Sequence, residues 1–546
     1  MSAEIPGVAA QGEIWDKSTV AEAEATGSGA AAADSAPTRR FKPVDRQQMV
    51  WAAMDVDALI PADHLARAIW ELTGKLDWSR FCAQVKAVEG KAGCSPYPPQ
   101  LLASLWILAL SEGIGSSREI EDLCRYHPAY RWLTGLRVVG YHTLADFRVE
   151  QKEELDELFA QVLAVLRDEG LIQLEQIMQD GTKVRAAASP GSMHREATLQ
   201  RHLEAARERV QQLEHSSEAE GEAEGESNSR RRAAQQRAAR EKMQRMEQSL
   251  EELEKVRAEA LAADSPKDPE ECRVSETEPE VRKMKQPITG GFAPSYNVQV
   301  VTDAAEDIIV SCQVVQAGND QGQLETGLEE VQRQTGVIPK QAVVDEGYLS
   351  WDTVREMAAR GVDLIGGGTA QDEKNAASNQ RRLENRGVAP EYYPQRFVYD
   401  AEQDLYRCPE GQSLPHRGVR QEQEGVLRHQ YRAPAATCQA CSHYAQCCPG
   451  SGKSGRTVTR TEYGPEIQAF VEKMKTPEAQ ILYRERKRVA EFPNLWLKTK
   501  LGLRRFRVRG LAKVSCETLW ACLTYNIQQW WRLRWKPRLA TSAVTA

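Results

Sequence analysis

Three carboxylates attract attention because of the residues that precede or surround them. Asp180 follows the apolar stretch LIQLEQIM, Asp345 follows QAVV, and Glu491 lies within a strongly basic stretch. Carboxylate oxygens are hard ligands that suit Mg²⁺ or Mn²⁺. Two such ions about 4 Å apart can activate an attacking oxygen and stabilise a leaving one during phosphoryl transfer. The three residues therefore form a candidate two-metal site, provided that the fold brings them together.

Each carboxylate also has an ordinary structural interpretation. The sequences Asp-Gly at 180–181 and Asp-Glu-Gly at 345–347 are both typical of turns. Glu491 lies four residues after Lys487, so the two could form an ion pair on an exposed helix face. Both interpretations stay open for each residue taken alone.

The surroundings of Glu491 favour a functional role. Residues 483–513 contain eleven lysines and arginines against two glutamates, in a chain whose formal net charge is -7. Such a local concentration of positive charge indicates a surface for a polyanion. On a helix Tyr483, Lys487 and Glu491 lie along one face, and Pro493 predicts that the helix kinks or ends just beyond the glutamate.

The order of the predicted elements could bring Asp180 and Asp345 to one edge of a sheet. Apolar patterning predicts, in chain order, three strands, a helix, a strand, a helix and a strand: residues 171–180, 295–303, 307–316, 321–334, 341–345, 350–360 and 362–367. This order predicts an α/β fold with a mixed sheet, in which the first three strands form an antiparallel meander and helices join the later ones. If the first and fourth strands are parallel neighbours, both aspartates lie at the same edge.

Composition and periodicity divide the remainder of the chain. We expect a disordered tail, an all-helical N-terminal domain, a catalytic domain and a flexible C-terminal tail: residues 1–43, 44–170, 171–530 and 531–546. We expect the helical domain to bind DNA, although a helical bundle that merely packs has the same periodicity. Two insertions interrupt the catalytic domain. Residues 190–285 are highly charged, with apolar positions at helical spacing that predict a helical hairpin, although a solvated helix without a partner fits as well. Residues 371–460 form a small Cys-rich β insertion.

The Cys-rich insertion could hold a structural zinc ion. It contains a C-x-x-C pair and two further cysteines with the ligand number of a tetrahedral site: Cys408, Cys438, Cys441 and Cys447. Cys448 or His443 could replace one of them, and incidental reduced cysteines are the alternative. Four thiolates would saturate the ion, so this zinc would not be catalytic.

The composition points to the cytoplasm. No apolar run reaches the roughly 18 residues that a membrane-spanning helix needs, and the first residues lack the pattern of a signal peptide. The twelve cysteines are then expected to be mostly reduced. We expect no membrane partner.

Taken together, these features resemble the bacterial insertion-sequence transposases of the DDE class, whose catalytic core has the ribonuclease H-like fold. The resemblance rests on TLADFR, MQDGTKVRA, GGFAPSYNVQVVTD, VVDEGY, the Cys-rich insertion and LGLRRFRVRGLAKV. It implies that Asp180, Asp345 and Glu491 are the catalytic ligands of two Mg²⁺ or Mn²⁺ ions. The family signature of tyrosine, arginine, glutamate and lysine is matched by Tyr483, Arg486, Glu491 and Lys498.

The resemblance also implies an activity and a partner. Such an enzyme cleaves double-stranded DNA at the ends of its element, joins the freed 3′-hydroxyls to target DNA and works as a homodimer that pairs two ends. It would act in the bacterial cytosol, associated with the nucleoid. The residues expected to contact DNA are Tyr483, Arg486, Lys498, Lys500, Arg504 and Arg505. Two alternatives stay open: a ribonuclease H-like nuclease that joins no strands, and an inactive or domesticated transposase that only binds DNA.

Overall fold

The central sheet contains the antiparallel meander and the parallel strands that the sequence predicts. Its central strand β1 (Gln176–Arg185) pairs antiparallel with β5 (Phe292–Asp303) on one side and parallel with β7 (Gln341–Val344) on the other. Strand β6 (Ile308–Val315) pairs antiparallel with β5, and β8 (Asp363–Ile365) extends the parallel side. An antiparallel meander followed by two parallel strands is the ribonuclease H-like arrangement, so the predicted fold class is confirmed.

The computed structural model describes residues 49, 51, 53–83, 85, 95–219, 226–262, 268–286, 290–367, 378, 380–421, 426–449 and 454–545. The elements discussed below all belong to the unit Asp55–Ala546. The predicted disordered tail, residues 1–43, lies outside the described residues. None of the described helices is both long enough and apolar enough to cross a membrane.

Helices join the parallel strands and cover the sheet. Helix α10 (Gln323–Thr335) leads from β6 to β7, and α11 (Trp351–Ala359) leads from β7 to β8. The basic stretch begins in α16 (Pro477–Thr499), which follows α15 (Pro465–Met474) and packs against β1, β5 and β7. Helix α17 (Leu511–Trp530) packs against β6.

The N-terminal part of the chain is helical, as the sequence predicts. Its helices are α1 (Leu65–Thr73), α2 (Ser79–Ala83), α3 (Pro99–Ser111), α4 (Ser117–Tyr126), α5 (Pro128–Thr134), α6 (Tyr141–Phe147) and α7 (Lys152–Asp168), after a short 3₁₀ turn at Asp57–Leu59. Ser116 caps α4 by accepting the Glu119 N–H, and Gly135 ends α5 in the left-handed conformation. Residues 101–110 of α3 are all buried, and α17 packs against both α3 and α7. The helical domain therefore shares one hydrophobic core with the sheet.

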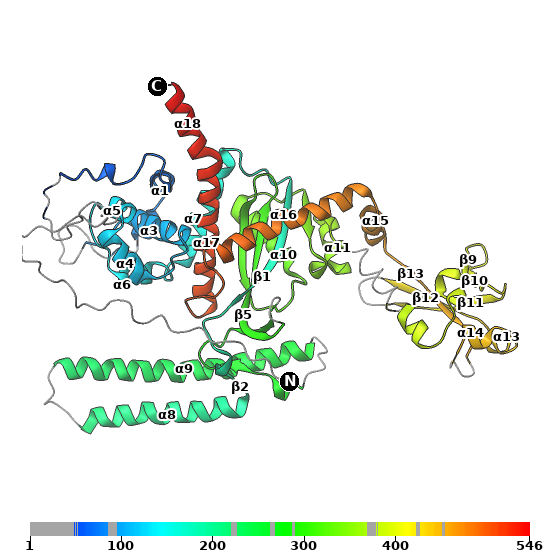
Figure 1. Ribbon diagram of the computed structural model, residues 1–546. Coiled ribbons are helices and arrows are strands. Elements are labelled where there is room, and N and C mark those ends of the chain that lie inside the picture. The colour runs from blue at the N-terminus through cyan, green and yellow to red at the C-terminus, as the bar shows by residue number, and fades with distance from the viewer. Residues whose placement is uncertain are drawn as a thin grey trace, which may run out of the picture. The chain divides into compact units, whose positions relative to one another are not determined.

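The charged insertion forms the predicted antiparallel hairpin. Its helices are α8 (Glu196–Ala219) and α9 (Glu226–Ala262), which Figure 1 shows side by side. Ion pairs join them at matched heights along their length: Arg257–Glu196, Arg207–Glu247 and Arg240–Glu214. At the base, β2 (Met193–His194) pairs antiparallel with β3 (Val274–Ser275). Strand β4 (Arg282–Lys285) then leads into β5, with whose first residues it pairs.

The Cys-rich insertion is a small antiparallel sheet with its own core. Its strands follow one another in space as in sequence: β9 (Val398–Asp400), β10 (Leu405–Arg407), β11 (Ser413–Gln421), β12 (Leu427–Arg432) and β13 (Thr457–Glu462). Two short helices, α13 (Ala435–Gln439) and α14 (Tyr444–Cys447), carry Cys438 and Cys447. The core consists of Phe397, Leu414, Tyr431, Ala433 and Val458.

Three boundaries differ from the sequence-based expectation. Strand β1 does not end near Asp180 but runs on to Arg185, because its pairing with β5 continues through Arg185–Ser295. Helix α16 does not end at Pro493 but continues to Thr499. The expected flexible tail 531–546 is helical as far as Thr545, as a π-helical turn (Trp531–Trp535) followed by α18 (Lys536–Thr545). The buried Trp535 stabilises this end, since its indole N–H donates to Glu71.

The contact between α17 and β6 supports a stability prediction. The fully buried Asn526 accepts the Ile309 N–H at 2.9 Å and donates to the Ile309 carbonyl at 2.7 Å. Asn526→Ala leaves both backbone groups unsatisfied, at a cost of about 2–4 kcal/mol. We expect a clearly lower melting temperature in a thermal-shift assay, whereas Gln468→Ala at an exposed helix position changes it little. Equal melting temperatures for the two variants would contradict the prediction.

Candidate active site

The strand register places Asp180 and Asp345 level with each other. Gln179 of β1 is the partner of Val344 at the end of β7, so the next residue on each strand is an aspartate. Asp345 leaves the sheet there and caps a short 3₁₀ turn (Glu346–Tyr348) by accepting the Glu346 N–H at 2.8 Å. The structure thus brings two of the three predicted carboxylates together at one edge of the sheet.

Helix α16 presents polar side chains to both aspartates. The Arg486 guanidinium lies between them, with nitrogens 4.0 Å from Asp180 Oδ1 and 3.6 Å from Asp345 Oδ1. Asn494 donates to Asp180 Oδ2 at 3.0 Å, and the Tyr483 hydroxyl donates to Asp345 Oδ1 at 3.2 Å. Because these residues recur at three- and eight-residue intervals, they share the face of α16 that covers the strand ends.

Burial dominates the electrostatics of the site. The pKa of Asp180 is raised to about 6, chiefly by burial and to a smaller extent by the neighbouring carboxylates Asp320 and Asp345, against the lowering effects of Arg486 and Asn494. Burial also lowers the pKa of Lys498, which lies near Asp180 on the same helix. The carboxylates at this edge therefore outnumber the cation that bridges them, and an additional cation would stabilise their charged forms.

Glu491 is placed differently from the two aspartates. It lies on α16 but is exposed, while Ala490 beside it is buried. Among the described residues, no hydrogen bond or ion pair joins Glu491 to Asp180, Asp345 or Lys487. In the part of the chain that the structure describes, the three predicted carboxylates do not form a group whose oxygens all lie within 4.8 Å of one another, and Glu491 forms no ion pair with Lys487.

A fourth carboxylate, Asp320, lies at the site but was not among the residues predicted from the sequence. It lies in the loop between β6 and α10, and its Oδ1 accepts hydrogen bonds from Asn297 at 2.8 Å and Gln299 at 2.7 Å. A Cβ atom on Gly181 would lie only 2.2 Å from the same oxygen. Asp320 is thus pressed against β1 immediately beside Asp180. The signal in the sequence is the pair of amides in the otherwise apolar YNVQVV, because buried amides require a polar partner.

The expected DNA-contacting residues do not all project freely. Lys500 and Arg504 are exposed, whereas Lys498 is half-buried. Arg505 donates to the carbonyls of Ala186 and Ala187 just beyond β1, at 3.1 and 2.9 Å. Arg505 therefore stabilises the backbone that follows β1, the strand that carries Asp180.

The predicted zinc-binding cysteines lie around one cavity in the Cys-rich insertion. All four line it, together with Cys448. The Sγ of Cys408 accepts the Gln412 N–H at 3.3 Å, and the Sγ of Cys438 accepts the Arg456 N–H at 3.4 Å. The Arg456 N–H favours the thiolate of Cys438, the form in which cysteine binds metal, but burial outweighs it and raises the pKa of this thiol. The sulfur donors fit a zinc ion in their chemistry and number.

Comparisons with protein families give two matches. Residues 407–531 match the model of a family described as "Transposase DDE domain", and residues 54–150 match "Transposase domain (DUF772)". The first match includes Glu491 and the basic stretch, while Asp180 and Asp345 lie outside both. No curated protein matches the chain.

Two solved structures share weak similarity with the chain. One is the cryo-EM structure of a piggyBac transposase synaptic complex with hairpin DNA, with 8% sequence identity, coverage of 88% of this chain and 81% of that chain, and a TM-score of 0.24. The other is the crystal structure of a pre-cleavage Mos1 transpososome, with 9% identity, coverage of 53% and 65%, and a TM-score of 0.13. At these TM-scores neither structure contributes to the argument.

The close approach of Asp320 to β1 leads to a prediction. In Gly181→Ala the new methyl group collides with Asp320 and Gln299, so these two side chains or the loop that carries Asp320 must shift. We expect a loss of about 1–3 kcal/mol in stability, as for other overpacked sites, measured by thermal denaturation. Gly191→Ala is the matched control, because the nearest atom to its added Cβ lies at 3.8 Å. A Gly181→Ala variant as stable as this control would show that the loop yields without cost.

Proposed function

We propose that this chain is a transposase of the DDE class, which binds the ends of its insertion sequence, cleaves them and joins the 3′-hydroxyls to target DNA. The matches of residues 407–531 and 54–150 to two transposase family models support this proposal. The observation that carries the proposal is the level placement of Asp180 and Asp345 beneath a basic helix. Carboxylates at one sheet edge can hold divalent cations, and the positive charge beside them can hold a phosphodiester.

The donor set at the strand ends fits Mg²⁺ or Mn²⁺. Asp180 and Asp345 offer hard oxygen ligands, and the pKa of Asp180 is raised first by burial and then by the neighbouring carboxylates Asp320 and Asp345. Two bound ions would activate the attacking oxygen and stabilise the leaving one. Glu491 is the proposed third ligand. Among the described residues its exposed side chain has no hydrogen bond or ion pair that must break before it turns toward the strand ends.

The remaining residues at the strand ends position the ligands and the substrate. The Tyr483 hydroxyl and the Glu346 N–H hold Asp345 Oδ1, and Asn494 holds Asp180 Oδ2. Lys498, Lys500 and Arg504 follow along and beyond α16, where they would contact the phosphates of DNA. Arg486 lies between the two aspartates, where its positive charge would offset the repulsion between the two carboxylates until the cations bind.

The proposed reaction consists of two phosphoryl transfers. Water attacks the phosphodiester at the end of the element and displaces a 3′-hydroxyl. This hydroxyl then attacks a phosphodiester of the target and displaces a second 3′-hydroxyl, so that one phosphodiester replaces another and no external energy source is needed. We propose that two copies of the chain pair the two ends, and that the helical domain contributes to DNA binding. The Cys-rich insertion would hold one structural Zn²⁺ ion.

Glu491→Gln tests the catalytic site. The substitution keeps the shape of the side chain but removes the charge that binds a metal ion, so we expect cleavage to fall at least about a thousandfold. DNA binding in a gel-shift assay should stay within about twofold, because no phosphate contact is lost. The assay is excision of an element flanked by the gene's own neighbouring DNA, with Mg²⁺ and, separately, with EDTA. Glu485→Gln on the same helix is the matched control and should cleave normally.

The products decide between the proposed function and its alternatives. Cleaved ends joined to a target plasmid support a transposase, and cleaved ends without joining support a nuclease. Binding of the ends without cleavage by the wild-type protein would support an inactive, DNA-binding relative. Full cleavage by Glu491→Gln would show that Glu491 is not a ligand of the catalytic metal ions.

The basic residues beyond α16 support a separate prediction about DNA affinity. Lys500→Ala and Arg504→Ala each remove one proposed phosphate contact, so affinity should fall for all DNA sequences alike. The slope of log affinity against log salt should fall by about 1 for each substitution. Lys340→Ala, which removes an exposed lysine paired with Glu175, should leave both quantities unchanged. An unchanged salt slope in the first two variants would exclude them from the DNA-binding surface.

A further inference from the structure

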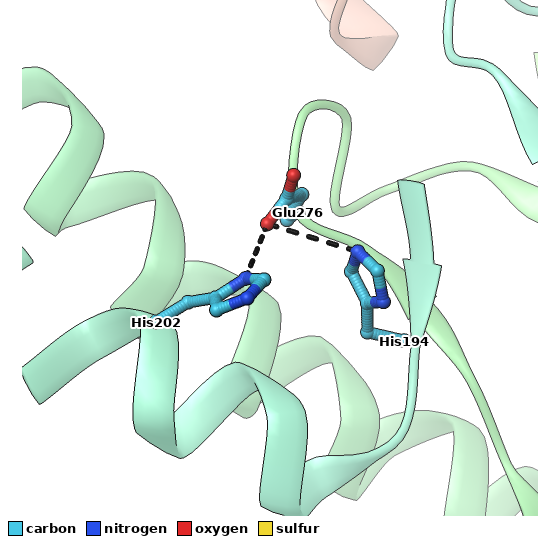
Figure 2. A group of neighbouring side chains, drawn as sticks. All are labelled: His194, His202 and Glu276. Carbon is cyan, nitrogen blue, oxygen red and sulfur yellow. Dashed lines mark hydrogen bonds and ion pairs between the residues drawn. The ribbon is translucent and has the colours of Figure 1, made fainter. Parts of the chain in front are cut away.

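Two histidines and a glutamate meet at the base of the helical hairpin (Figure 2). His194 ends β2, His202 lies in the second turn of α8, and Glu276 follows β3. One potential ligand atom from each residue lies within 4.8 Å of the other two. Figure 2 shows both imidazole rings directed at the same carboxylate. No element of the candidate active site contributes to this group.

The backbone around the three residues is held by several hydrogen bonds. The Glu276 N–H donates to the Ser192 carbonyl at 2.9 Å, next to the pairing of His194 with Val274. The hydroxyl of Ser249 on α9 donates to the Ser275 carbonyl at 3.2 Å. The strand pair and both hairpin helices therefore fix the positions from which the three side chains project.

A simple hydrogen-bonded cluster accounts for only part of this geometry. His202 Nδ1 lies 2.7 Å from Glu276 Oε2, which is a hydrogen bond, but His194 Nε2 lies 3.8 Å from the same oxygen, which is too far for one. The two rings are nearly perpendicular, with centroids 5.3 Å apart. Ligand atoms around a tetrahedral ion with bonds of about 2.0–2.1 Å lie about 3.4 Å from one another. The two distances from Glu276 Oε2 to the histidine nitrogens, 2.7 and 3.8 Å, fall on either side of this value. Small side-chain rotations would therefore bring all three ligand atoms to the separation that the ion requires.

We propose that His194, His202 and Glu276 bind one transition-metal ion of the Zn²⁺ class. Imidazole nitrogens favour such an ion over Mg²⁺, and a single carboxylate completes a three-ligand set with a fourth position open to water. The side chains are 24%, 34% and 26% exposed, so the ion can enter from solvent. A metal ion bound at these residues would link α8 to β2 and to the segment after β3, and would so stabilise the base of the hairpin.

Zinc titration of the full chain tests the proposal. The parent protein is Cys438→Ser/Cys441→Ser, which removes the thiolate site, and excess Mg²⁺ occupies the carboxylates at the strand ends. After removal of bound metal, calorimetry should show roughly one equivalent of Zn²⁺. His202→Ala and Glu276→Gln should each weaken this binding at least about a hundredfold. His215→Ala, farther along α8, is the matched control and should bind as the parent does.

Two further measurements separate a lost ligand from a lost fold. Zn²⁺ should raise the melting temperature of the parent and of His215→Ala, but not that of His202→Ala. In the chain with all its cysteines, His202→Ala should lower the zinc content by one equivalent. The proposal is overturned if the parent binds no zinc in the presence of Mg²⁺, or if His202→Ala and Glu276→Gln retain the parent's affinity and zinc content.

Discussion

The parallel pairing of β1 with β7 is the contact on which the candidate active site depends. It ends at Gln179 and Val344, so that Asp180 and Asp345 leave the last pair together. A shift of one residue in this register would turn one aspartate to the opposite face of the sheet. The pairing also sets an electrostatic demand, because two carboxylates side by side in a partly buried place repel each other. Arg486, only 6% exposed, meets part of that demand from α16.

Arg486 can offset the charge of the two aspartates only if helix α16 stays close to the strand ends. The buried residues Val489, Ala490 and Leu497 of this helix pack in the main hydrophobic core, which anchors the helix on the sheet. The exposed side then carries Lys487, Arg488 and Glu491. One helix thus combines an apolar anchor, a counter-charge for the aspartates and a basic outer surface. This combination explains how a chain with an overall negative charge can present positive charge beside its carboxylates.

The sequence was sufficient for the fold because each strand has a strong local signal. The apolar runs before Asp180 and Asp345, the paired runs around residues 295–316 and the intervening helices leave few alternative orders. The level placement of the two aspartates follows from that order. Contacts made across long distances in the chain could not be predicted in the same way. Asp320 reaches Asn297 and Gln299 through a loop, and Asn494 reaches Asp180 across 314 residues.

Local rules also failed where tertiary contacts outweighed them. Asp-Gly at 180–181 is typical of a turn, yet pairing along β5 keeps both residues in the strand, and the missing side chain of Gly181 makes room for Asp320. Pro493 cannot donate a backbone hydrogen bond, yet it is buried against the core and α16 continues past it. The exposure of Glu491 follows from its position on the helix next to the buried Ala490. The spacing of Tyr483, Lys487 and Glu491 could not reveal which face of the helix meets the sheet.

The shared core of the N-terminal helices and the sheet has a consequence for how such a chain can change over evolution. Helix α17 packs against α3 and α7 as well as against β6, so the helical block is not an exchangeable module. A different helical block could not simply be attached in its place, because α17 would lose its packing against α3 and α7. The hairpin and the Cys-rich sheet have small cores of their own, so we expect them to tolerate replacement more readily. Sequence variation between related enzymes should therefore concentrate in the two insertions. Substitutions in α3 and α7 should be accompanied by substitutions in α17, because these helices pack against one another.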